Sequence, residues 1–251
     1  MTSTLSLATS RRRRSRTHGE SQTAKPVTLR LLPLLALLLS LTLVFIGGRL
    51  LLAGIASYQT QAFLDDWASK GAEPNPRAWQ IAHEAAQRAV DLYPGRNGEH
   101  LERLGRVLQW QQFRQPFGAP AAEQPRRQAL QAFRAASEAR PTWPNNWAAL
   151  AYAKLYLLEF DTEFASALQQ AQALGPNRIE VNRSLAEIGF IAWPQLNDEQ
   201  RNATLESARR TVKHGSKEAQ NLLAIASQTG MTRELCDNLD TALKDTRKIC
   251  R

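Results

Sequence analysis

Carboxylates are among the side chains that carry acid–base chemistry, and the segment EFDTEF brings three of them within five residues. They are Glu159, Asp161 and Glu163. A pair of carboxylates could serve glycoside hydrolysis. These three, however, sit at a predicted helix boundary, where Asp161 or Thr162 would cap the helix and Glu163 would interact favourably with its dipole. We expect them to be structural.

The histidines and the glycines offer no better catalytic set. The histidines are His18, His83, His100 and His214, and no two of them have the HxxxH or HExxH spacing of a zinc enzyme. The sequence also contains no phosphate-binding loop and no GxSxG nucleophile turn. Because a catalyst needs groups of matched chemistry brought together, we expect no catalytic residue, no metal, no cofactor and no enzymatic activity.

The two cysteines, Cys236 and Cys250, have no other cysteine to compete for them. In an oxidising compartment an even pair of this kind most simply forms a disulfide. A zinc site would need two further ligands, and the nearest histidine, His214, is remote in sequence. We therefore predict a disulfide between Cys236 and Cys250.

The residues before position 57 have the pattern of a membrane anchor. Seven basic residues and one acidic residue, Glu20, precede residue 31, and the next 26 residues carry a single charge, Arg49. A helix over residues 31–55 is long enough to cross a hydrocarbon layer of roughly 30 Å, and Arg49 near its far end can extend to the interface. Because basic flanks stay in the cytoplasm, we expect residues 1–30 to form a disordered cytoplasmic segment and the later residues to lie outside the cytoplasm.

Two other interpretations of this region are open. Gly54, Ile55 and Ala56 resemble the small-x-small site of a cleaved signal peptide, but the apolar run is long for one and about thirty residues precede it. The arginines from Arg11 to Arg16 could instead contact nucleic acid. From Ser57 onward, however, 24 basic residues are balanced by 22 acidic ones. The excess charge is therefore local, and we expect a retained anchor and no nucleic-acid partner.

The rest of the chain predicts one helix after another, and hence an all-α fold. Ala, Leu, Arg, Gln and Glu dominate, and no convincing strand pattern occurs. We expect a linker over residues 56–75, a helical domain over residues 76–230, and a helical segment with the disulfide over residues 231–251.

Several polar residues predict where helices begin. Asn75 followed by Pro76 has the pattern of a helix cap and first-turn proline. Two pairs have the spacing of a capping box, which predicts helix starts near residues 178 and 198. These pairs are Asn177 with Glu180 and Asn197 with Gln200.

Two segments share a spacing typical of the second helix of a tetratricopeptide repeat (TPR). The two sets are Ala82, Ala86, Ala89 and Pro94, and Ala129, Phe133, Ala136 and Pro141. First helices fit the pattern W-x2-L-G-x2-Y more loosely, at Leu101, Leu104, Gly105 and Leu108, and at Trp147, Leu150, Ala151 and Lys154. Residues 111–125 lengthen one connection. We expect a degenerate TPR-like solenoid of at least three helical hairpins.

The aromatic-rich stretch from Trp143 to Phe160 predicts mainly helix packing. Residues with helical spacing share one face and would be buried, and the predicted core set is Trp143, Trp147, Leu150, Phe160, Phe164 and Trp193. Tyr152 and Tyr156 are four residues apart and off the Trp147 face, so they could line a binding surface. Together with Phe113 and Phe117 from the long connection, they are the predicted partner-binding residues.

Four short motifs also carry a family resemblance. They are WPNNW at residues 143–147, EFDTEF at 159–164, LGP at 174–176, and Trp193. With these motifs, residues 65–230 resemble the VpsP-type proteins associated with bacterial exopolysaccharide biosynthesis loci. The resemblance implies an inner-membrane protein with a periplasmic TPR-like domain that serves polysaccharide assembly or export, and it supplies no catalytic residues. The basic N-terminus is longer than is typical of the family, and the final segment matches it less well.

These features together predict a non-catalytic scaffold anchored in the membrane by one helix. Its expected partners are proteins of polysaccharide synthesis or export. An assembly factor for another cell-envelope enzyme complex is the alternative, and pull-down from detergent extracts would separate the two. An enzyme that modifies glycans is a third possibility, which requires turnover by the purified domain.

Overall fold

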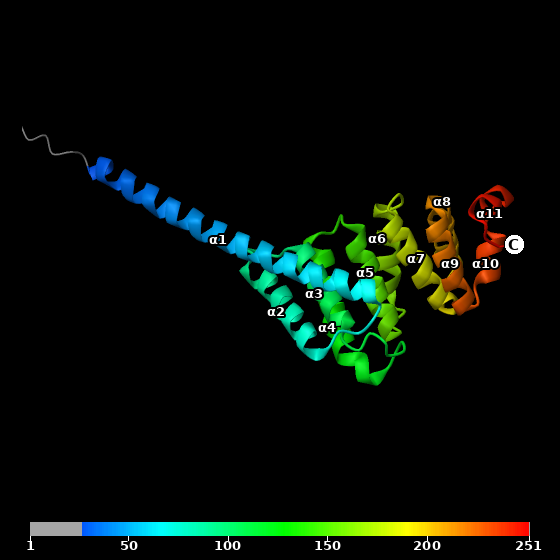
Figure 1. The fold of residues 1–251 in the computed structure, drawn as a ribbon. Coiled ribbons are helices and arrows are strands. Elements are labelled where there is room, and N and C mark those ends of the chain that lie inside the picture. Colours follow the sequence, from blue (N-terminus) through cyan, green and yellow to red (C-terminus); the bar gives the residue numbers. More distant parts are fainter. Residues whose placement is uncertain (1–26, 251) are drawn as a thin grey trace, which may run out of the picture. The chain divides into compact units, whose positions relative to one another are not determined.

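The computed structural model describes residues 27–250, and the long regular elements in that range are α-helices (Figure 1). The expected all-α fold is confirmed. In chain order the helices are α1 (Val27–Lys70), α2 (Pro76–Leu92), α3 (Gly98–Trp110), α4 (Glu123–Ala139), α5 (Pro144–Leu157), α6 (Thr162–Leu174), α7 (Ile179–Ala192), α8 (Asp198–His214), α9 (Ser216–Thr229), α10 (Thr232–Asp237) and α11 (Thr241–Arg247), with short 3-10 turns at Pro120–Ala122 and Trp193–Gln195.

Helix α1 begins with a long apolar stretch. Its side chains over residues 31–48 are exposed, and an 18-residue window reaches a mean hydropathy of 2.4 with none of its residues buried. By length and composition the helix could be a membrane anchor or a signal sequence. The arginines of residues 11–16 lie outside the described residues. The chain divides into two compact units between Val44 and Phe45, and the second unit contains helices α2 to α11.

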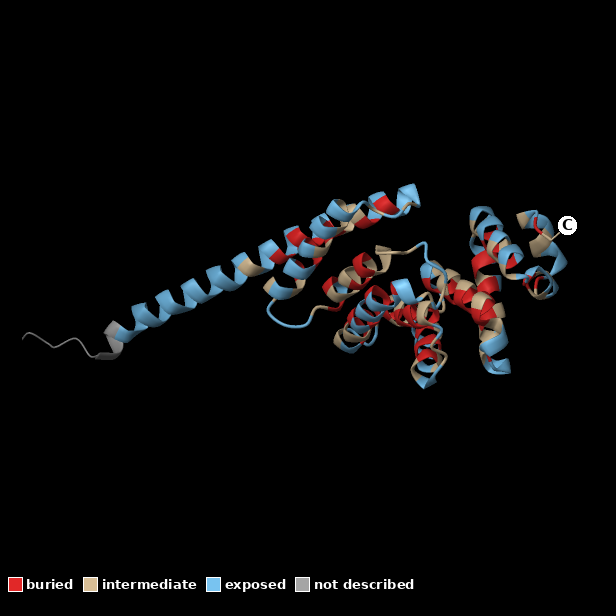
Figure 2. Cartoon of the chain, turned by 90° about the horizontal axis from the view of Figure 1, so that it is seen from below, coloured by how far each residue is buried: buried red, intermediate tan, exposed pale blue. Residues whose placement is uncertain are grey.

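The linker expected over residues 56–75 is largely helical in the structure. Helix α1 continues without a break to Lys70, and Figure 2 shows buried residues recurring along this part of it. A buried stripe at helical spacing explains the continuation, because it packs against α2 and α3. The stripe consists of Ala56, Thr60, Leu64 and Trp67. This part of α1 is thus the first helix of the first hairpin, and the turn to α2 is only five residues long.

Arg49 contacts protein as well as lying near the end of the apolar stretch. Its Nη2 donates to the carbonyl of Asp91 at 2.7 Å, and its Nε donates to the carbonyl of Leu92 at 3.0 Å. Both carbonyls belong to the last turn of α2, where a helix has unpaired acceptors and favours positive charge. Arg49 therefore caps α2.

The remaining helices pack as successive hairpins with TPR-like spacing. Helices α3 and α4, α5 and α6, and α7 and α8 form neighbouring pairs, and the first helices α3, α5, α7 and α9 also contact one another in one layer. The helical residues at the predicted repeat spacing are buried, whereas Pro94 and Pro141, which end the two sets, are exposed. The buried residues are Ala82, Ala86, Ala89, Ala129, Phe133 and Ala136. A Cβ on Gly105 would come within 2.7 Å of the Phe133 ring. The small residue therefore lets α3 and α4 approach closely.

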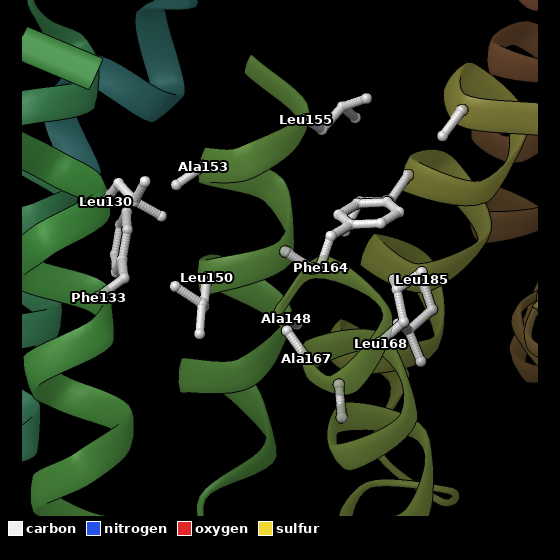
Figure 3. Packing of buried hydrophobic residues seen from close by; sticks show 14 of the residues in the cluster. Leu130, Phe133, Ala148, Leu150, Ala153, Leu155, Phe164, Ala167, Leu168 and Leu185 are labelled. Atoms are coloured by element: carbon white, nitrogen blue, oxygen red, sulfur yellow. The ribbon is translucent and has the colours of Figure 1, made fainter. Parts of the chain in front are cut away.

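The main hydrophobic core lies on both sides of α5. In Figure 3, Leu130 and Phe133 of α4 lie on one side of α5, and Phe164 and Leu168 of α6 lie on the other. A helix covered on two sides needs apolar residues around most of its circumference. Helix α5 accordingly buries Ala148, Leu150, Ala151, Ala153 and Leu155.

The predicted core residues fall into three groups. Leu150 and Phe164 are almost fully buried, and Trp147, Phe160 and Trp193 are half-buried against the core. Trp143 lies elsewhere. It precedes α5, and the guanidinium carbons of Arg140 and Arg178 lie 4.0 and 4.2 Å from its ring centroid.

One of the two predicted capping boxes is present. Asn197 and Gln200 bond reciprocally at the start of α8, which confirms that prediction. The box at Asn177 is wrong, because α7 begins at Ile179 with Arg178 as its cap residue. The Asn182 side chain instead donates to the carbonyl of Pro176 at 3.0 Å, which fixes the turn before α7 without a capping box.

The C-terminal helices α10 and α11 close the last hydrophobic cluster. Leu235, Leu239 and Ile249 are buried against residues of α8 and α9. Cys236 and Cys250 are joined by a disulfide, with their Cα atoms 5.6 Å apart. The bond ties the end of α11 back to α10.

A candidate partner-binding groove

A groove lies on the layer formed by the first helices α3, α5 and α7. It consists of two open hollows of about 510 and 390 Å³. Arg106, Gln109 and Tyr152 line both hollows, so the two are continuous.

Helical spacing explains which side chains face the groove. Residues at relative positions 0, 4 and 7 share one face of a helix, and each of the three helices contributes such a stripe. The stripes are Glu102, Arg106 and Gln109 on α3, Asn145, Ala149 and Tyr152 on α5, and Glu180, Ser184 and Glu187 on α7. The opposite faces of α5 and α7 carry core residues such as Leu150 and Leu185.

The larger hollow is lined by aromatic side chains. Trp110 and Phe113 lie with ring centroids 4.6 Å apart, and Tyr152 and Tyr156 lie 5.2 Å apart. Phe117 packs on Tyr156 at 5.0 Å. The structure therefore brings the four predicted partner-binding residues to one place, with Phe113, Tyr152 and Tyr156 lining the hollow and Phe117 supporting Tyr156. Their role in binding stays a prediction.

The connection that carries Phe113 and Phe117 is fixed by hydrogen bonds to its backbone. Arg126, which is buried, donates to the carbonyls of Gln115 at 2.6 Å and of Pro116 at 2.7 Å. The Gly118 N–H donates to the carbonyl of Tyr156 at 2.9 Å. Gly118 has a φ of +72°, a conformation that favours glycine. The aromatic rings of this long connection are therefore held in position against α5.

Tyr152 links the aromatic hollow to α7. Its hydroxyl donates to Glu187 Oε1 at 2.7 Å. Burial, with the nearby Glu187 carboxylate second, raises the pKa of Tyr152 well above its ordinary value, and burial raises the pKa of Tyr156 as well. Both hydroxyls therefore stay protonated at neutral pH, and Tyr152 acts as a donor that orients Glu187.

The smaller hollow is polar and acidic. Glu102 and Arg106 form a long ion pair, with Nε and Oε1 3.8 Å apart. Burial raises the pKa of Glu102 despite this arginine. Asn145 Oδ1 is buried and accepts no hydrogen bond from the described residues. This end of the groove thus holds a carboxylate with only a long ion pair and a buried amide oxygen without a hydrogen-bond donor among the described residues.

The EFDTEF carboxylates lie outside the groove and surround a buried lysine. The Lys154 ammonium lies 2.9 Å from both Asp161 and Glu163 and 3.3 Å from Glu159. Burial lowers the pKa of Lys154, but hydrogen bonds to Glu163 and Asp161 more than offset this, so its pKa is raised. Asp161 also caps α6 by accepting from the Phe164 N–H at 3.0 Å. These contacts explain the motif structurally.

Several groove residues were not singled out in the sequence, and they include Glu102, Arg106, Trp110 and Glu187. The available signal was the 0, 4, 7 spacing of polar residues opposite the apolar face of each first helix. That spacing predicts a polar face on each helix. It does not show that the three faces lie side by side, because the helices come from different hairpins.

No family model matches the chain, and no curated protein matches it. Among solved structures, one titled "Crystal structure of MamA protein" is 17% identical and aligns over 79% of this chain and 98% of that chain, with a TM-score of 0.43. At that TM-score the likeness carries no argument about fold or function.

Proposed function

We propose that the protein is a non-catalytic scaffold that binds a polypeptide segment of a partner in the groove on α3, α5 and α7. One observation carries this proposal: side chains from three separate hairpins converge on one aromatic-lined hollow. Pockets of this kind, with aromatic anchors and a few oriented polar groups, are typical of binding hot spots. The fixed connection at Phe113 and Phe117 supports it, because a preorganised surface loses less entropy on binding.

The proposed scaffold is anchored in a bacterial inner membrane by the apolar part of α1. Support comes from the uninterrupted apolar stretch and from the basic residues that precede it in the sequence. With this orientation the helical array is periplasmic. The disulfide between Cys236 and Cys250 fits an oxidising compartment of that kind.

The proposed pathway is the biosynthesis or export of an exopolysaccharide. It rests on the VpsP-type resemblance of motifs such as WPNNW and EFDTEF alone. An assembly factor for another cell-envelope complex uses the same groove, and the identity of the bound protein separates the two.

Photo-crosslinking in cells tests the proposed function. A benzoylphenylalanine in place of Phe113 lies in the groove, and one in place of the exposed Gln131 on α4 serves as the control. We expect one discrete adduct from position 113 and none from position 131, and mass spectrometry of the adduct identifies the pathway. Absence of any adduct from position 113, with normal polymer yield from a Phe113→Ala strain, would contradict the proposal.

A further inference from the structure

Acidic groups outnumber basic ones in the groove. Its titratable charged side chains are Glu102, Glu180 and Glu187 against Arg106. Arg106 already pairs with Glu102. The other two carboxylates have no ion-pair partner among the described residues, so the groove carries an uncompensated negative charge.

Glu187 is the carboxylate placed best to receive a cation. Tyr152 donates to one of its oxygens and thereby fixes its direction, while the second oxygen has no donor among the described residues. The aromatic hollow lies beside it, with Trp110, Phe113 and Tyr156 along its wall. Lysine and arginine side chains combine a long apolar stem with a charged tip. Such a stem fits the aromatic wall, and its tip reaches Glu187.

We propose that the groove recognises a cationic polypeptide segment, with a lysine or arginine side chain lying along the aromatic wall and its charge paired with Glu187. This proposal rests on the function proposed above and names the chemical class of the partner. A second basic residue of the same segment meets the smaller hollow, where Glu102 and Glu180 lie. Cation–π contact with Trp110 adds to the attraction.

Other occupants fit the groove less well. An acidic segment would meet three carboxylates and one guanidinium that is already paired, and like charges in a partly buried site disfavour binding. A sugar stacked on Tyr156 would need an open face of that ring. The Tyr156 ring is instead surrounded by Phe117, Tyr152 and the Arg126 guanidinium, whose Cζ lies 5.0 Å from the ring centroid.

Peptide selection on the full chain tests the proposal. The protein is placed in nanodiscs of uncharged phosphatidylcholine, so that basic peptides are not drawn to the lipid, and a random twelve-residue peptide library is selected on it after depletion on empty nanodiscs. We expect the enriched peptides to be rich in lysine and arginine. Their affinity should fall about five- to tenfold in Glu187→Gln and should weaken as salt is raised.

Matched variants separate charge from shape. Glu84→Gln removes the same charge from an exposed position on α2 and should leave the affinity unchanged. Tyr152→Phe keeps the ring but removes the hydroxyl that orients Glu187. It should therefore lower the affinity for basic peptides less than Glu187→Gln does. Circular dichroism verifies that each variant retains its helices.

The possible results are distinguishable. Basic peptides whose binding depends on Glu187 support the proposal. Acidic or uncharged peptides that lose affinity in Phe113→Ala but not in Glu187→Gln overturn the cationic partner and leave the groove's function standing. Peptides whose affinity is unchanged in both variants, or the absence of any enriched peptide, would overturn the proposed function together with this inference.

Discussion

Lys154 holds its ammonium 2.9 Å from Glu163 Oε2, although the lysine side chain is only 2% exposed. Arg134 contacts the same carboxylate from the neighbouring helix α4, with Nε 2.6 Å from Oε1 and Nη2 2.8 Å from Oε2. Glu163 thus joins α4, α5 and α6 through charge-assisted hydrogen bonds. A buried charge is tolerated only when it is paired and hydrogen-bonded in this way.

Glu163 should make the fold sensitive to acid. Hydrogen bonds from Arg134, and then from Lys154, lower the pKa of Glu163 from 4.5 to about 2 against the opposing effect of burial. Because the folded-state pKa lies below the unfolded one, the stabilisation is complete above about pH 4.5 and is lost as the pH falls towards 2. It is worth about 1–2 kcal/mol after solvent screening. Thermal melts from pH 7 to pH 3 should show a steeper loss of stability in the wild type than in Glu163→Gln, and parallel curves would contradict this assignment.

Replacing Lys154 by methionine should be strongly destabilising. The substitution leaves Glu159, Asp161 and Glu163 close together without their shared cation, and removing one partner of a buried pair costs about 3–5 kcal/mol. Partial exposure of the three acids reduces this cost to about 2–4 kcal/mol. Chemical denaturation at pH 7 measures it. The control is Lys70→Met, which removes an exposed ion pair with Asp66 and should change the free energy of unfolding by at most about 1 kcal/mol. Equal losses of stability in the two variants would contradict the prediction.

Gly105→Ala should force α3 and α4 apart. The added Cβ would lie 2.7 Å from the Phe133 ring, which is fully buried and has little room to move. Overpacking of this kind costs about 1–3 kcal/mol and should lower Tm by about 3–8 °C. Gly54→Ala in α1 is the matched control, because no atom lies within 4 Å of its Cβ and alanine favours helix by about 0.5–1 kcal/mol. A Tm for Gly105→Ala at or above that of the wild type would show that the helices can separate freely.

Loss of the disulfide should loosen the C-terminal segment and spare the groove. The bond joins residues 14 positions apart, and a loop of this size is worth about 3 kcal/mol. In Cys236→Ser/Cys250→Ser, amide hydrogen exchange should therefore rise over residues 231–250 and stay unchanged in α3 and α5. Unchanged protection of α10 and α11 would mean that Leu235 and Ile249 hold the segment without the bond.

Local sequence patterns could predict much of the fold. The alanine spacing in α2 and α4 reports close helix packing, and the Asn197 box marks a helix start through chemistry that is complete within four residues. The first helix of the first hairpin was missed for a physical reason. Its buried stripe in α1 contains the small Ala56 and the polar Thr60 beside Leu64 and Trp67, and no turn residue separates it from the apolar stretch.

The groove could be predicted only in part. The spacing within one helix is enough to show that Tyr152 and Tyr156 lie off the face of Trp147, so this part of the groove could be predicted. Glu187 becomes part of the site because α5 and α7 pack side by side, and contacts of that kind depend on tertiary structure. Trp143 shows the same limit: a large aromatic ring was expected in the core, yet it lies between two arginines.

The two ends of the helical array have a consequence for assembly. At the first end, Leu64 and Trp67 of α1 cover the hydrophobic cluster of α2 and α3, and at the last end Leu235 and Ile249 cover that of α8 and α9. Repeat arrays need such terminal covers to stay soluble, since bare ends stack on one another. Because residues of this chain cover both clusters, these apolar surfaces are not offered to other copies, which disfavours end-to-end stacking through them.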